Sequence, residues 1–279
     1  MNKIILGENI ETNIDDKIKI SITDKYDDVK KIIIDVIKNA DITFIFNKKQ
    51  KLQIDLNIAK NKKCNIIEYK ENKKYKLQYK YNLEENSYLN ITKINDVKKT
   101  KELILFNLNG KNAKVDYLLK TISKNEEKYS LMVYHNSKNT ISNIINHAVN
   151  IKEGEIKFDV SGFVPNNITN CVVNQEGRII NLTDNKCEIK PNLFIDENDV
   201  TASHSAHIGK CNDDKIFYLQ SRGITKKEAE MLLIKGFLTS KLTKTKKHME
   251  KIIKTYWQGR WKNESWRFWN IKNRHNLFW

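Results

Sequence analysis

Apolar and polar residues alternate through most of this chain. The pattern is clearest at residues 42–46 (ITFIF), 52–58 (LQIDLNI) and 75–83 (YKLQYKYNL). A period of two places every second side chain on one face of an extended strand, so we expect strands from about residue 42 to residue 217. Short polar connections separate these segments and helical patterning between them is scarce, which predicts an all-β body. The alternation is compatible with both a β-sandwich and a β-solenoid.

Two regions have the spacing of an amphipathic helix instead. Near the start, apolar residues at positions 29, 32, 33, 36 and 37 predict one short helix. Near the end, Thr225 followed by Glu228 has the spacing of a capping box. The apolar residues that follow on one face are Ala229, Leu232, Leu233 and Phe237. A second helix is expected from about Thr243 to Tyr256.

These patterns divide the chain into four segments. We expect an N-terminal segment with one short helix at 1–40, a β core at 41–219 and a helical segment at 220–257. The last segment, 258–279, is basic and rich in tryptophan, since all five tryptophans of the chain lie from Trp257 onward. It continues neither pattern, and we expect it to be poorly ordered and most of the five indoles to be exposed to solvent.

Composition excludes several classes of protein. No apolar run approaches the roughly 20 residues that span a bilayer, and the N-terminus lacks the features of a secretory signal, so we expect a cytoplasmic protein without a membrane span. The four cysteines show no metal-binding spacing, which favours reduced thiols. The phosphate-binding motif GxxxxGK[ST] is missing, so any ATP hydrolysis must come from a partner.

The net charge of +16 raises the alternative of a nucleic-acid-binding module. Only five of the 50 basic residues are arginine, and lysine, asparagine and isoleucine are abundant along the whole chain. Phosphate recognition prefers the arginine fork, so the charge is better explained by a lysine-rich composition typical of AT-rich codons. We expect no nucleic-acid partner.

One long segment is distinctive. Residues 190–238 read KPNLFIDENDVTASHSAHIGKCNDDKIFYLQSRGITKKEAEMLLIKGFL, and the segment HNSKNTISNIINHAVNIKEGEIKFDVSGFVPNN begins at His135. Both resemble the C-terminal core signature of the SufB/SufD family, the scaffold proteins of the SUF iron–sulfur cluster assembly system. The tetrapeptide SHSA at residues 203–206 is more similar to the SufD-like form of this signature than to the E-H-E-A of SufB-like members.

The resemblance implies a fold, a function and partners. The fold is a right-handed parallel β-helix, a solenoid, with a C-terminal helical segment. The function is that of a non-enzymatic scaffold subunit, which assembles with a SufC-like ATPase and with a SufB-like subunit or a second copy of itself. The family's ATPase-docking surface corresponds to the helical end of this chain, which implies partner-binding roles for Arg222, Gly223, Leu232 and Phe237. The alternative from another class is a β-solenoid enzyme that acts on a sugar or polyanion, although no pair of carboxylates stands out for it.

His204 is the candidate for binding the cluster or its metal. In an extended strand, Ala202, His204 and Ala206 share one face and His207 points to the other, so the two histidines do not form a metal pair. Many SufD-like relatives have a cysteine at the position of Ala202, and its replacement leaves a lone imidazole. The resemblance therefore implies that the isolated chain binds no stable cofactor and that an iron–sulfur cluster is held transiently in the complex.

The sequence leaves His204 two alternative roles. It is an ordinary hydrogen-bonded histidine in a core or interface, or it combines with Cys187, because Cys171, Cys187 and His204 are spaced at about the length of a solenoid turn.

Overall fold

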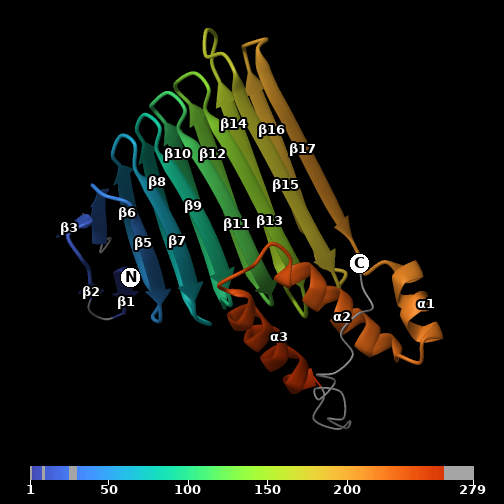
Figure 1. Ribbon diagram of the computed structural model, residues 1–279. Coiled ribbons are helices and arrows are strands. Elements are labelled where there is room, and N and C mark those ends of the chain that lie inside the picture. Colours follow the sequence, from blue (N-terminus) through green and yellow to red (C-terminus); the bar gives the residue numbers. More distant parts are fainter. Residues whose placement is uncertain (1, 8–9, 25–29, 261–279) are drawn as a thin grey trace.

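The computed structural model describes residues 2–7, 10–24 and 30–260, with side chains up to Trp257. Two long sheets face each other and form a β-solenoid, with helices at one corner (Figure 1). The first sheet has nine strands: β1 (Asn2–Leu6), β2 (Ile10–Asn13), β5 (Ala40–Phe46), β7 (Lys63–Lys70), β9 (Tyr88–Asn95), β11 (Lys114–Ser123), β13 (Ile141–Asn150), β15 (Cys171–Asn181) and β17 (Val200–Gly209). The second has eight: β3 (Ile18–Asp24), β4 (Lys30–Val36), β6 (Gln50–Ile58), β8 (Lys74–Leu83), β10 (Lys99–Leu108), β12 (Glu126–His135), β14 (Glu155–Val164) and β16 (Cys187–Ile195).

From β4 onward the chain alternates between the two sheets, and from β5 onward each strand pairs in parallel with the strand one turn earlier. The pairing has no slip from β4 through β16, so residues at equivalent positions form straight rows across each sheet. Inward-facing rows of Ile, Leu, Phe and Tyr fill the space between the sheets. The rings of Tyr81 and Phe106, for example, stack with their centroids 5.1 Å apart. The strands predicted from the period-two pattern are confirmed, and so is the parallel solenoid that the family resemblance implied.

Asparagines stabilise one corner of the solenoid. Asn61, Asn86, Asn112 and Asn139 occupy equivalent turn positions, and each has a positive φ of 53–61°. Asparagine tolerates this left-handed conformation better than most residues. The side-chain amides of Asn86, Asn112 and Asn139 each donate a hydrogen bond to the side-chain oxygen of the asparagine one turn earlier, at distances of 2.7–3.1 Å. We call this row the asparagine ladder.

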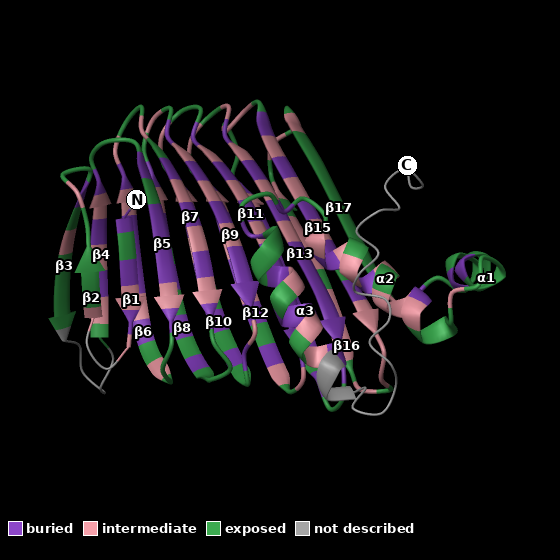
Figure 2. Cartoon of the chain, turned by 60° about the horizontal axis from the view of Figure 1, so that its bottom comes forward, coloured by how far each residue is buried: buried purple, intermediate pink, exposed green. Residues whose placement is uncertain are grey.

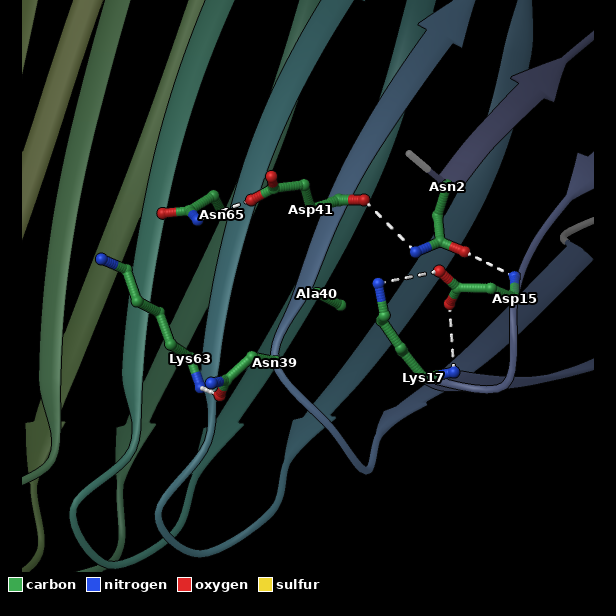
Figure 3. A pocket seen from close by; sticks show the side chains of 8 residues that line it. All are labelled: Asn2, Asp15, Lys17, Asn39, Ala40, Asp41, Lys63 and Asn65. Carbon is green, nitrogen blue, oxygen red and sulfur yellow. Dashed lines mark hydrogen bonds and ion pairs between the residues drawn. The ribbon is translucent and has the colours of Figure 1, made fainter.

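Antiparallel strands cover the N-terminal end of the solenoid. β2 pairs with β1 and β3 with β4, both antiparallel. A shallow polar pocket of about 280 Å³ lies beside them, lined by Asn2, Asp15, Lys17, Asn39, Ala40, Asp41, Lys63 and Asn65 (Figure 3). Its polar groups largely bond to one another, as in the ion pair of Lys17 with Asp15 and the hydrogen bond from Asn65 to Asp41. We assign it no ligand.

Two of the secondary-structure predictions are wrong. The short helix expected at residues 29–37 is the strand β4, in which Ile32, Ile34 and Val36 face the core. The strand pattern expected to reach residue 217 ends at Gly209, and α1 (Asp213–Ser221) follows it. The side chain of Asn212 caps α1 by accepting a hydrogen bond from the backbone N–H of Lys215, and two aspartates occupy its first turn. These are good helix-start residues that the apolar alternation obscured.

Two further helices cover part of the nine-stranded sheet. They are α2 (Lys226–Thr239), which begins with the predicted capping box of Thr225 and Glu228, and α3 (Lys246–Arg260), which confirms the second predicted helix. Ile234, Leu238 and Met249 pack on the outward-facing residues Ile122 and Val149 of the sheet. Trp257 belongs to this cluster and is buried. The other four tryptophans lie outside the described residues, so the expectation that most of the five are exposed stays a prediction. Most of the predicted tail, 261–279, lies outside the described residues. Within the described part of the chain, every helix is too short or too polar to cross a membrane.

Candidate functional site

The C-terminal end of the solenoid is open. β17 is the last strand of its sheet, and among the described residues only β15 pairs with it. Thr201 to Ile208 are all exposed, and Figure 2 shows the strand as a mostly green edge. The inward-facing residues of β17 include Val200 and Ile208, and Ile208 is 42% exposed. Terminal turns of solenoids usually present a polar outer face, so an apolar inward row without cover is typical of a surface that another protein completes.

His204 lies in the middle of this open edge. It pairs with Gln175 of β15, and its inward-facing row also contains Ala202 and Ala206. His207 pairs with Arg178, which faces outward. The strand geometry therefore places the two histidines on opposite faces, as the sequence predicts, and makes His204 an exposed residue at an edge rather than part of a core.

Gln175, the neighbour of His204, has an incomplete set of hydrogen bonds. Its side chain is 5% exposed. The amide nitrogen donates to the backbone oxygen of Asn192 at 3.2 Å, but the side-chain oxygen Oε1 is buried and has no hydrogen-bond partner. A buried polar atom of this kind costs roughly 1–3 kcal/mol. A donor from a group that covers the open end would remove this cost.

The cysteines do not gather around His204. Cys171 begins β15 and pairs with Val200, four residues along the edge from His204. Its Sγ lies 3.2 Å from Oγ1 of Thr140 in a small apolar cluster. Cys187 begins β16, beyond the opposite end of β15, where Asn150 donates to its Sγ at 3.4 Å. Burial raises the pKa of the Cys187 thiol. The stacked arrangement of the two cysteines with His204 does not form.

The other sheet also has an aromatic residue exposed at the open end. Tyr134, Phe163 and Phe194 form a stack across β12, β14 and β16, with ring centroids 4.6 and 4.8 Å apart. Phe194 is the last ring of the stack and is 52% exposed. Its uncovered face extends the apolar surface of the open end onto β16.

The helical segment has an exposed apolar surface of its own. Phe217 and Tyr218 of α1 are 74% and 49% exposed, and Leu232 of α2 is 43% exposed. Arg222 is the C-cap residue that follows α1, and its guanidinium lies 5.4 Å from the centroid of the Tyr218 ring. Gly223 has a φ of +82°, which glycine adopts without strain, and so it allows the sharp turn between α1 and α2. Three of the four residues predicted to bind a partner, Arg222, Gly223 and Leu232, thus lie at or near this surface.

The fourth, Phe237, has an intramolecular contact that the sequence did not predict. Its ring stacks on the imidazole of His147, with the centroids 4.8 Å apart. Its backbone oxygen accepts a hydrogen bond from the ammonium of Lys120 at 3.0 Å. This packing anchors the end of α2 to the sheet.

Lys120 is at the centre of this anchor and is fully buried. Its Nζ lies 2.7 Å from Nδ1 of His147 and also donates to Oγ of Ser240 at 3.0 Å. Burial lowers the pKa of His147 to about 4, so the imidazole is neutral near pH 7. Its Nε2–H then donates to Glu176 at 2.7 Å and leaves Nδ1 to accept from Lys120. We call Lys120, His147 and Glu176 the helix anchor.

A second group of buried charges lies inside the solenoid. Glu68, Lys70, Lys93 and Glu102 are all 0–2% exposed and form alternating ion pairs. Lys93 Nζ lies 3.0 Å from Glu102 and 3.2 Å from Glu68. Burial opposes the ionisation of Glu102, but the ammonium groups of Lys70 and Lys93 outweigh it and lower its pKa to about 2. We call these four residues the buried charge cluster.

The pattern of the SufBD core domain of SUF system FeS cluster assembly matches residues 22–237. Since this is most of the chain, the protein belongs to the SufBD core family, and the resemblance seen in the sequence is confirmed.

Relatives within the family carry the name SufD. The iron–sulfur cluster assembly protein SufD of Bacillus subtilis is 33% identical over 135 residues, which cover 47% of this chain and 31% of that protein. SufD of Escherichia coli is 33% identical over 94 residues, covering 34% of this chain and 19% of its own length. A SufBD family protein of Pyrococcus horikoshii is 38% identical over 53 residues, 19% of this chain and 12% of that protein. The chain therefore spans less than a third of the length of these relatives.

Sequence reasoning missed the exposed aromatics of α1, the helix anchor and the buried charge cluster. The charged residues of the cluster stand at inward positions of the alternation, where an apolar residue is expected. That signal was present in the sequence, but the high content of lysine and glutamate concealed it.

Proposed function

We propose that this chain is a SufD-like, non-enzymatic scaffold subunit that supports iron–sulfur cluster assembly within a SUF complex. Membership of the SufBD core family supports a role in iron–sulfur cluster assembly. The observation that carries the proposal is the open end of the solenoid, where the last strands β16 and β17 each have one paired neighbour among the described residues. The apolar row of β17, the exposed Phe194 of β16 and the unpaired oxygen of Gln175 on the adjacent β15 lie at this end. A subunit that works alone would be expected to cover such an edge. The predicted cytoplasmic location stays a prediction.

The partner at the open end is a SufB-like subunit or a second copy of this chain. Its edge strand adds to β17 or β16, and it covers the apolar row and Phe194. His204 then offers an imidazole to a cluster in transit, which is cargo rather than a resident cofactor. Within the described residues, no group of three or more His, Cys, Asp or Glu could hold a metal ion, so the remaining ligands come from the partner in this proposal.

The partner at the helical segment is a SufC-like ATPase, which supplies the ATP hydrolysis. Phe217, Tyr218 and Leu232 form its apolar docking surface, and Arg222 lies at the rim. Aromatic residues and arginine are the residue types that most often dominate binding at protein interfaces. Phe237 acts indirectly here, since it holds α2 on the sheet.

Pull-down with the SufC-like ATPase of the same organism tests this surface. We expect the full-length chain to retain the ATPase, and Phe217→Asp combined with Leu232→Asp to abolish retention, because two charges enter an apolar interface. Ile14→Asp is the matched control, since Ile14 is 39% exposed at the distant N-terminal end. Equal retention by all three proteins would rule out the helical surface as the ATPase site.

A substitution of His204 tests the open end. We expect His204→Ala to reduce cluster assembly by the complex while the unfolding midpoint of the single chain stays within about 2 °C of the wild type, because the exposed imidazole contributes little to folding. His207→Ala is the control, and it should leave cluster assembly nearly unchanged because it faces away. Cluster content is measured by absorbance and iron analysis of the purified complex. Undiminished cluster content in His204→Ala would remove His204 from the site.

A further inference from the structure

The outer face of the eight-stranded sheet has a straight row of lysines. Lys51, Lys76, Lys101, Lys128 and Lys157 pair in register across five neighbouring strands. Adjacent strands lie roughly 4.8 Å apart, and like charges directly opposite one another destabilise a sheet. The helices pack on the other sheet, so they provide no cover for this row (Figure 1).

The positive charge is concentrated at one end of this row. The outward positions of β6, β8 and β10 have six lysines, which we call the lysine face: Lys51, Lys74, Lys76, Lys80, Lys99 and Lys101. The only acidic residue at outward positions of these three strands is Asp55, and it pairs with Lys31 at 2.7 Å. Further along the row, Lys128 pairs with Glu126 and Lys157 with Glu188, and Glu126 also pairs with Lys99 of the lysine face. Among the described residues, Lys51, Lys76 and Lys101 have no such carboxylate.

A uniformly lysine-rich composition does not account for this distribution. β7 and β9 belong to the same part of the solenoid, and their outward positions have a single lysine, Lys63. The other two lysines of β7 and β9, Lys70 and Lys93, point inward and are paired in the buried charge cluster. The lysine face is therefore a local feature of one sheet.

We propose that the lysine face is a docking site for an acidic polypeptide segment of a partner protein. Charge complementarity supplies the attraction and speeds the encounter. The site goes beyond the proposed scaffold function, since it lies away from β17 and from the helices.

The chemistry of the face favours a protein over a nucleic acid. Leu103 is 38% exposed and lies next to Lys101 along β10, and its cross-strand neighbours are the uncharged Gln78 and Ser130. The lysine face therefore borders on an exposed apolar side chain, which a polypeptide with apolar as well as acidic residues can contact. The aromatic residues of these strands, Tyr75, Tyr79, Tyr81 and Phe106, are buried and cannot stack on bases, and the face has no arginine.

Binding of fluorescein-labelled poly-L-glutamate, measured by fluorescence anisotropy at low salt, tests the charge of the face. We expect the triple variant Lys51→Gln, Lys76→Gln and Lys101→Gln to bind about tenfold more weakly than the wild type. The control removes the same charge from exposed lysines at the helical end, Lys210→Gln, Lys215→Gln and Lys244→Gln, and should weaken binding by no more than about twofold. Equal losses in the two variants would overturn the proposal, because binding would then follow net charge alone. An unfolding midpoint no lower than that of the wild type confirms that each variant is folded.

Two further probes test the class of partner. A random glutamate–tyrosine copolymer should bind more tightly than poly-L-glutamate, and Leu103→Ser should abolish that difference. Single-stranded DNA of similar length should bind more weakly than the copolymer. If DNA binds as tightly as the copolymer and loses affinity equally in the lysine variant, the face is a nucleic-acid site instead. The triple lysine variant should still retain the SufC-like ATPase in a pull-down. Weaker binding of the acidic polymer would then be independent of the proposed scaffold function.

Discussion

Lys93→Met is expected to lower the free energy of unfolding by about 3–5 kcal/mol, the typical cost of breaking a buried ion pair from one side. Lys93 Nζ contacts both Glu68 and Glu102, and it lies 3.5 Å from the centroid of the Tyr79 ring. Without it, two buried carboxylates share the single ammonium of Lys70. Urea unfolding at pH 7, followed by circular dichroism, measures the loss.

The control for this prediction is the double variant Lys93→Met with Glu102→Gln. It removes one charge of each sign and leaves Glu68 paired with Lys70. We expect the double variant to be more stable than Lys93→Met alone, because no uncompensated carboxylate remains. If the two variants are equally unstable, the cost lies in lost packing of the lysine stem and not in the charge.

Lys120→Met is expected to loosen α2 and α3 from the solenoid, with a loss of about 1–3 kcal/mol in the free energy of local opening. The substitution leaves Nδ1 of His147, the backbone oxygen of Phe237 and Oγ of Ser240 without the donor they share. Hydrogen exchange measured by mass spectrometry should show faster exchange in α2 and α3 and unchanged exchange in β5 to β9. Lys114→Met is the control, since Lys114 lies at the start of the same strand, β11, and pairs with Asp116 instead of with a helix. Uniformly faster exchange along the chain would contradict a local anchor.

The helix anchor also has a predicted pH dependence. Burial, with Lys241 nearby, lowers the pKa of Lys120 from 10.5 to about 7. Between these two values the unfolded chain binds more protons at this site than the folded chain, so the attachment of the helices should strengthen as the pH rises from about 7 towards 10. Lys120→Met should lack this dependence.

The sequence predicted the strands because the pattern that specifies them is local: each strand alternates apolar and polar residues. The alternation fitted a sandwich as well as a solenoid, and the solenoid was predicted from the resemblance to the SufB/SufD family. The error at residues 29–37 has a physical cause: a run such as Ile32, Ile33 and Ile34 fits either period, and its length alone did not decide between them. A strand forms here because Ile32, Ile34 and Val36 extend the inward-facing rows of β6.

The candidate site was predictable only in part. The alternation placed His204 and His207 on opposite faces, and the structure agrees. Sequence spacing could not place Cys171 and Cys187 at opposite ends of β15, because that depends on where the chain turns between the sheets. Nor could it find the helix anchor, which joins Lys120 to the end of α2 across 117 residues of sequence. Contacts of this kind arise from the docking of whole elements.

The asparagine ladder has a consequence for how such a chain changes length in evolution. Its members are 25, 26 and 27 residues apart, yet they remain in register, so the extra residues are absorbed elsewhere in each turn. Each turn contacts mainly its neighbours, and a whole turn bounded by two asparagines is therefore a unit that a gene could duplicate or delete without repacking the rest. Descendants of one ancestor could thus differ in the number of turns while keeping the same open end and the same helices.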